Sequence, residues 1–169
     1  LYIGIYKLCQ KKWLKMFKII DNFLSEQEFT NINNLLTSEN FSWYFNNYKT
    51  SATIQELFEY QLIHIFYDKD NVNSDHFNCL KPILSKLNCL SLIRAKVNLN
   101  PITQNLIKFK PHKDQSFKCK VALYYVNTNN GYTMIEEKKI ESKKNRMVLF
   151  DSTTEHYGTN STDCNNRMV

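Results

Sequence analysis

The stretch KFKPHKDQSFKCKVALYYVN (Lys108–Asn127) decides how the rest of the chain is interpreted. It places His112 two residues before Asp114, directly ahead of a segment whose composition is typical of a β-strand. Successive side chains of a strand point to opposite faces, so Tyr125 shares a face with Val121. An H-x-D pair alone has little specificity, and its meaning depends on the residues that follow it.

The segments on either side of this stretch predict a mainly β protein with helices near its N-terminus. Two amphipathic helices are expected, one over 25–38, where Ser25 and Glu28 form a capping box, and one over 74–88. From Leu90 onward, short strand-like segments alternate with turns that contain Asn, Gly and Pro. Such a succession is typical of a β-sandwich, a barrel or a jelly roll. The predicted class is therefore α+β, with the β part dominant.

Length, charge and cysteine content limit the classes of function. The 169 residues suit a single domain, and no apolar run is as long as a membrane span. The formal charge of +6 is concentrated in residues 1–15, because the rest of the chain holds 18 basic and 16 acidic residues. A nucleic-acid partner is therefore disfavoured. Five cysteines without a CxxC pair indicate a reducing, cytoplasmic location and argue against a disulfide framework or a structural zinc site.

The two ends of the sequence predict that the natural domain starts inside it. Residues 1–15 are rich in lysine, whereas Met16 opens the regular pattern MFKIIDNFLSEQEF. We therefore interpret 1–15 as a non-native or upstream extension and 16–169 as one domain. The last residues, NNRMV (165–169), have the character of a strand, which predicts a truncated C-terminus.

Four polar residues are spaced along the β-rich half in a pattern that suits metal chemistry. His112 and Asp114 precede one predicted strand, His156 follows another (146–151), and Arg167 lies 11 residues beyond His156. Two imidazoles and one carboxylate on one side of a metal leave other positions open, which suits non-haem Fe(II). A nearby arginine offers a planar, bidentate partner for a carboxylate. The hypothesis requires the three metal-binding side chains to converge on one point inside the fold.

The same half carries an ordered set of motifs, namely HKD, LYYVN, GYT, NRMVLFD, EHYG and NNRMV. This set resembles the Fe(II)/2-oxoglutarate-dependent dioxygenases, particularly the prolyl-4-hydroxylase-like branch with its small phage and bacterial members. The resemblance covers 16–169 and is strongest from Lys108 onward. It implies a double-stranded β-helix, the cupin-like jelly roll. It also implies hydroxylation of a substrate, with decarboxylation of 2-oxoglutarate to succinate.

The resemblance further implies roles for individual residues. The implied iron ligands are His112, Asp114 and His156. Arg167 would pair with the distal carboxylate of 2-oxoglutarate, and Tyr125 would donate a hydrogen bond to the same carboxylate. Asn98 or Asn100 would contact this cosubstrate. Dioxygen is the second cosubstrate, and ascorbate is a further cofactor candidate.

Two other classes of function stay open. One is a non-catalytic binding module with a jelly-roll or cupin-like fold, and the other is a metal enzyme that does not use 2-oxoglutarate. An intact set of motifs argues against the first class, since a degenerate domain is expected to lose a member. Arg167 and Tyr125 argue against the second, because only a carboxylate-bearing cosubstrate needs that pair. No motif identifies the substrate, a peptidyl side chain such as proline or a small molecule, or the oligomeric state.

Overall fold

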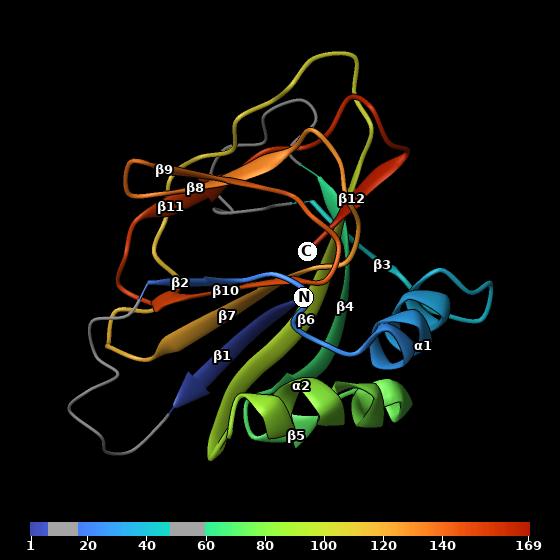
Figure 1. The fold of residues 1–169 in the computed structure, drawn as a ribbon, viewed down its shortest axis with the longest axis vertical. Coiled ribbons are helices and arrows are strands. Elements are labelled where there is room, and N and C mark those ends of the chain that lie inside the picture. The colour runs from blue at the N-terminus through green and yellow to red at the C-terminus, as the bar shows by residue number, and fades with distance from the viewer. Residues whose placement is uncertain (7–16, 48–59) are drawn as a thin grey trace.

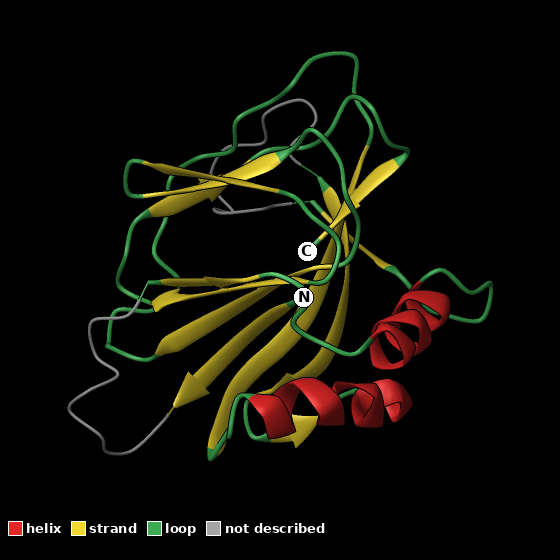
Figure 2. Cartoon of the chain, in the orientation of Figure 1, coloured by secondary structure: helices red, strands yellow, loops and turns green. Residues whose placement is uncertain are grey.

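The computed structural model describes residues 1–6, 17–47 and 60–169, which form two antiparallel β-sheets and two helical regions. The large sheet contains β1 (Tyr2–Tyr6), β2 (Lys18–Ile20), β3 (Tyr44–Asn46), β4 (Gln61–Asp68), β5 (Asn71–Val72), β6 (Ser91–Pro101), β7 (Lys120–Tyr125), β10 (Arg146–Asp151) and β12 (Asn166–Met168). The small sheet contains β8 (Tyr132–Ile135), β9 (Lys138–Glu141) and β11 (His156–Gly158). Figures 1 and 2 show the two sheets as layers, with the helices on the outer side of the large sheet. The predicted dominance of β structure is confirmed.

The order of strands brings together segments that are distant in the sequence. The main path of the large sheet is β2-β10-β7-β1-β6-β4-β3, with β12 paired to β6 and β5 paired to β4. The small sheet has the order β11-β8-β9. The strand that begins the H-x-D connection, β6, therefore lies near the strand that ends it, β7, with β1 between them.

Alternate residues of β7 belong to two separate cores. Val121, Leu123 and Tyr125 pack between the two sheets, in a cluster with residues of β8, β9 and β10. Tyr124 points the other way, toward the helices. The predicted common face of Val121 and Tyr125 is confirmed. Because both faces are covered, all residues of β7 except the first are buried.

The first helix begins where its capping residues predict. In α1 (Glu26–Leu36), the Ser25 hydroxyl accepts a hydrogen bond from the backbone N–H of Glu28. The Glu28 carboxylate accepts one from the backbone N–H of Ser25, which completes the capping box. The buried side chains of this helix are Phe29, Ile32 and Leu36.

The second helical region differs from the single helix predicted over 74–88. It consists of the 3₁₀ helix η1 (Asp75–Leu80) followed by α2 (Lys81–Lys86). Pro82 lies in the first turn of α2, where its missing N–H and fixed φ are tolerated, whereas an α-helical interior would lose a hydrogen bond there. The proline therefore divides the predicted helix into two segments.

β1 and β12 lie end to end in one strand position beside β6 (Figure 1). The backbone of Val169 exchanges two hydrogen bonds with Asn98, and Tyr2 is opposite Lys96. The register along β6 therefore runs without a gap from β12 through Leu1 into β1. The two chain segments together form one composite strand, which we call the β12–β1 strand.

The β12–β1 strand gives structure to part of the segment 1–15 that the sequence assigned to an extension. Leu1 and Ile3 are buried in the core between the large sheet and the helices. Tyr2, on the opposite face, packs between the two sheets. Residues 7–15 of the predicted extension lie outside the described residues.

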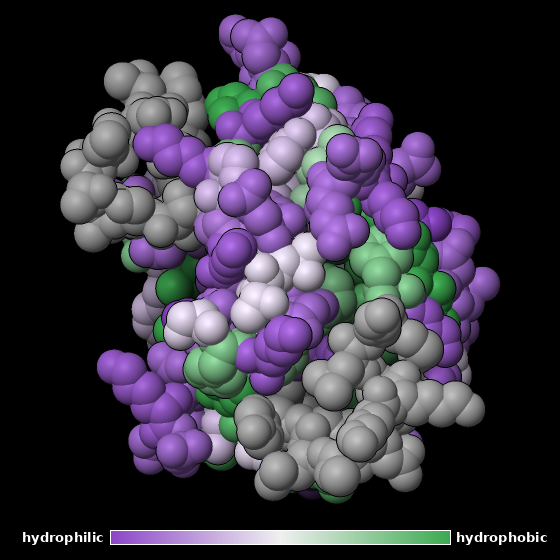
Figure 3. Space-filling model, turned by 90° about the vertical axis from the view of Figure 1, so that its left-hand side faces the viewer, coloured by the Kyte–Doolittle hydropathy of each residue, from purple (hydrophilic) through white to green (hydrophobic). Residues whose placement is uncertain are grey.

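The surface gives little sign of a wide apolar region in the view of Figure 3. The described residues on this face are mostly hydrophilic, with small hydrophobic areas among them. In the described part of the chain, no helix is both long enough and apolar enough to cross a bilayer.

Candidate metal centre

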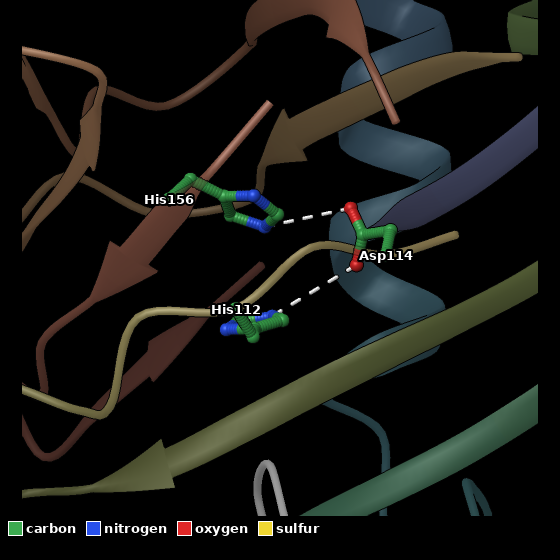
Figure 4. Close-up of side chains that lie close together, drawn as sticks. All are labelled: His112, Asp114 and His156. Carbon is green, nitrogen blue, oxygen red and sulfur yellow. Dashed lines mark ion pairs between the residues drawn. The ribbon is translucent and has the colours of Figure 1, made fainter. Parts of the chain in front are cut away.

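Three predicted ligands converge although they lie far apart in the sequence. His112 and Asp114 lie in the connection between β6 and β7, whereas His156 begins β11 of the small sheet. His112 and His156 exchange two backbone hydrogen bonds, which hold this connection beside β11. One potential ligand atom from each of the three side chains lies within 4.8 Å of the other two. Figure 4 shows the Asp114 carboxylate facing both imidazoles, so the cluster could hold a metal ion.

Both imidazoles present Nε2 to the carboxylate. Nε2 of His112 is 3.8 Å from Asp114 Oδ1, and Nε2 of His156 is 3.4 Å from Asp114 Oδ2. The Nδ1 atoms of the two rings lie 3.2 and 3.0 Å from the carbonyl oxygens of Lys110 and Thr154. A carbonyl oxygen can only accept, so each Nδ1 carries the proton. The lone pair of each Nε2 is then free for a metal.

Burial favours the neutral form of all three groups. It raises the pKa of Asp114 to about 6 and lowers the pKa of His112 and of His156. Asp114 Oδ2 is buried and has no hydrogen-bond partner within the described ranges. A buried carboxylate oxygen without a partner costs free energy, and a bound cation would remove that cost. The donor set therefore fits a divalent metal.

The second charged feature is Arg167 of β12, which is buried. Its Nε donates to Ser142 Oγ at 2.8 Å, its Nη1 to the Thr159 carbonyl oxygen at 3.1 Å and its Nη2 to Thr133 Oγ1 at 2.9 Å. These acceptors are all neutral, and no carboxylate of the described residues lies within ion-pair distance of the guanidinium. A buried cation without a negative partner is costly, so this position suits an anionic ligand.

Thr133 connects Arg167 to Tyr125. Besides the bond from Arg167, Thr133 Oγ1 accepts a hydrogen bond from the Tyr125 hydroxyl at 2.8 Å. A hydroxyl has two acceptor positions and one donor position, so the Thr133 proton is left for another acceptor. Thr133 also lines the pocket described below. Tyr125 therefore supports the arginine through Thr133, and its direct bond to a cosubstrate stays a prediction.

The candidate metal cluster and the arginine line one pocket. Its lining includes His112, Asp114, His156, Arg167, Thr133, Asn98 and Asn100. The two asparagines follow the alternation of β6, and both Oδ1 atoms are buried without a hydrogen-bond partner in the part of the chain described. The pocket therefore combines a candidate metal cluster, a buried cation and amide oxygens without a hydrogen-bond partner among the described residues.

Gly131 of the GYT motif allows a close approach of the backbone to Arg167. A Cβ atom at this position would lie 2.6 Å from Arg167 Cδ and 2.4 Å from the carbonyl oxygen of Asn160. Neither approach is possible without a backbone shift, since the second contact is with main-chain atoms. The glycine is thus required by packing around the arginine.

Sequence reasoning missed some residues of the pocket. Lys96 lines it, and strand alternation could have found this residue, since Asn98 and Asn100 share its face. Thr133 is the threonine of the GYT motif, which formed part of the resemblance, but no role in the pocket was predicted for it. No pattern marks Tyr2, because its segment was interpreted as an extension.

The remaining histidine in a strand, His64, does not belong to this site. Its Nδ1 lies 2.7 Å from the Ser42 carbonyl oxygen and its Nε2 lies 2.7 Å from Ser74 Oγ. The ring also packs against Phe41 and Phe66. His64 is thus a hydrogen-bonded residue of the core, as expected for a histidine among apolar neighbours.

The arrangement of the whole chain has a counterpart among solved structures. The crystal structure of a prolyl-4-hydroxylase from Pseudomonas putida matches with a TM-score of 0.56 and 13% identity, over 90% of this chain and 88% of that chain. At this identity the likeness shows the fold and not the activity. No model of a protein family matches the sequence, and no curated protein matches it. The chain is thus a mainly β protein with a prolyl-4-hydroxylase-like fold and a candidate His/Asp/His metal site.

Proposed function

We propose that the chain is a non-haem Fe(II)- and 2-oxoglutarate-dependent dioxygenase that hydroxylates a substrate from a jelly-roll (double-stranded β-helix) domain. One observation carries the proposal: three candidate metal ligands line the same pocket as a buried arginine that has no acidic partner among the described residues. A metal alone leaves the charge of Arg167 unbalanced. A dicarboxylate that reaches both the metal and the arginine satisfies both sides. The prolyl-4-hydroxylase-like fold supports the same class.

In this proposal the ligands of Fe(II) are Nε2 of His112, Nε2 of His156 and the Asp114 carboxylate. Iron with open positions supplies the dioxygen chemistry when 2-oxoglutarate is bound. The three side chains leave one side of the cluster open toward the pocket, where the cosubstrate would bind. The backbone carbonyls that accept from both Nδ1–H groups fix the ring orientations before any metal arrives.

The other residues of the pocket would bind and orient 2-oxoglutarate. Arg167 would bind the distal carboxylate, and Thr133 would donate its free proton to the same group. Asn98 and Asn100 would offer amide groups along the cosubstrate. The apolar lining residues, among them Leu123 and Val169, would keep water away from the charged groups.

The wider parts of the proposal concern substrate and location. We place the reaction on a peptidyl side chain such as proline or on a small molecule, with ascorbate as an accessory reductant and with nucleic acid disfavoured. A cytoplasmic location is supported by the cysteines, since Cys79, Cys89, Cys119 and Cys164 are all free.

The test is anaerobic addition of Fe(II) and then 2-oxoglutarate to the full-length protein. A weak charge-transfer band in the visible region should appear only when both are present, and His112→Ala should abolish it. The control His76→Ala, a histidine outside the pocket, should keep the band. Fe(II) binding without any 2-oxoglutarate binding would favour a metal enzyme of another kind. Absence of both would favour a binding module without metal.

A further inference from the structure

A second cation lies in the pocket, on the same strand as the two asparagines. Lys96, Asn98 and Asn100 alternate along the inner face of β6 and all line the pocket. Asn100 is opposite Arg167 in the register, whereas Lys96 is opposite Tyr2. Four residues of a strand span about 13 Å, so Lys96 and Arg167 belong to different ends of the pocket.

The charged groups that act on Lys96 are Arg94, Asp114 and Asp68. Its ammonium lies 5.9 Å from the centre of the Tyr2 ring. Within the described residues, no carboxylate is within ion-pair distance of it. Burial and the nearby Arg94 lower the pKa of Lys96 to about 8, so the ammonium stays mainly charged near neutral pH. A desolvated cation is therefore held beside the metal-binding cluster without being neutralised.

Tyr2 adds a hydrogen-bond donor to the lining of the same pocket. It is buried between the two sheets, and burial raises the pKa of its phenol, so the hydroxyl keeps its proton. A protonated phenol can donate its hydrogen to an acceptor in the pocket, which Tyr2 and Lys96 both line. A cation and a neutral donor together are suited to an oxyanion.

The balance of charge favours an anion beyond the cosubstrate. Lys96 and Arg167 contribute two positive charges and a divalent metal contributes two more, against the single negative charge of Asp114. A dianionic 2-oxoglutarate still leaves the pocket positive. Asn98, in the middle, is neutral and cannot remove this excess.

We propose that Lys96 and Tyr2 form a second anion-binding position, which takes a carboxylate or phosphate group of the primary substrate. The inference rests on the proposed function, because it assigns the Arg167 end of the pocket to 2-oxoglutarate. Lys96 lines the pocket, and the cavity measures only about 100 Å³. The substrate class is therefore a compact organic acid or organic phosphate, whose anionic group anchors it next to the metal.

The test is calorimetric titration of the Zn(II)-loaded, full-length protein with inorganic phosphate and, separately, with acetate. Each probe is added before and after saturation with 2-oxoglutarate. We expect a probe to bind in both conditions, and Lys96→Met to weaken that binding by about tenfold or more. Lys96→Arg should keep most of the affinity. Lys118→Met removes the same charge from an exposed position and should change nothing. Stronger binding of phosphate indicates an organic phosphate, and stronger binding of acetate indicates an organic acid.

Other outcomes would overturn the proposal. They are failure of both probes to bind, displacement of the probes by 2-oxoglutarate, and unchanged binding by Lys96→Met. Weakening by Arg167→Met alone would place the anion at the arginine end. Binding of 2-oxoglutarate is measured in the same titrations, so its failure contradicts the proposed function separately from the second position. Thermal melting checks the fold of each variant, and Lys96→Gln replaces Lys96→Met if the latter does not fold.

Discussion

The two ends of the pocket differ in the charge of their polar groups. At the metal end, formed by His112, Asp114 and His156, the two Nε2 atoms lie 3.4 and 3.8 Å from the Asp114 carboxylate oxygens. At the arginine end, the hydrogen-bond acceptors of Arg167 are all neutral. Under the proposed function, a metal bound at the first end and a carboxylate bound at the second balance these charges. The difference between the ends is that they suit ligands of opposite charge.

The two ends also differ in what holds them in place. Arg167 makes three hydrogen bonds to three different segments, so folding alone fixes its position. The metal-binding side chains make no hydrogen bond to one another, and only their Nδ1 atoms contact backbone carbonyls. Removal of a metal ligand should therefore spare the fold, whereas removal of the arginine should weaken it.

The largest expected effect is loss of metal binding in His112→Ala. We expect the affinity for Zn(II), measured by calorimetry, to fall by a factor of about 100 or more, because one of three protein ligands is lost. The melting temperature of the metal-free protein should change little, since His112 is only partly buried. A large loss of stability without metal would contradict the contrast between the two ends. His76→Ala is the matched control.

The next largest effect is expected for Arg167→Met, which should weaken the binding of 2-oxoglutarate without weakening the binding of metal. Affinity for 2-oxoglutarate should fall by about 30-fold or more, while affinity for the metal stays within a few-fold of the unchanged protein. Stability should fall by about 2 to 4 kcal/mol, because three buried acceptors lose their donor. Calorimetry and urea unfolding measure these two quantities.

The matched control for this prediction is Arg146→Met. The Arg146 side chain is paired with Asp21 at the surface and does not line the pocket. It should leave the affinity for 2-oxoglutarate unchanged. Equal loss of metal and 2-oxoglutarate binding in Arg167→Met would mean that the ends are not separable.

The convergence of the three candidate metal ligands could be predicted from sequence, and the strand beneath the pocket could not. His112, Asp114 and His156 occur in a fixed order relative to strand-like segments, so their convergence follows from how such strands pair. The position of Tyr2 depends on pairing with β6 and β7, which are about 90 to 120 residues away. Local pattern does not encode such distant partners. A lysine-rich neighbourhood also favoured the interpretation as an extension.

The smallest effect concerns Arg146, which is paired with a carboxylate, whereas no carboxylate of the described residues pairs with Arg167. Its guanidinium binds both oxygens of Asp21 at 2.6 and 3.1 Å, and Lys143 lies 2.9 Å from the same carboxylate. Hydrogen bonds from Arg146 and then Lys143 lower the pKa of Asp21 to about 2. The Asp21 side chain is more than a third exposed, so solvent screens the ion pair. We therefore expect Asp21→Asn to lower the free energy of unfolding by less than about 1 kcal/mol.

The direction of the pH dependence follows from the lowered pKa of Asp21. The folded chain holds this proton less tightly than the unfolded chain, so the contribution to stability is present above about pH 4. It should be lost as the pH falls toward 2. Urea unfolding of the unchanged protein and of Asp21→Asn should therefore differ at pH 5 and converge at low pH. If the two proteins still differed in stability at low pH, the Asp21–Arg146 pair would contribute through packing. Charge pairing would then not explain the contrast between Arg146 and Arg167.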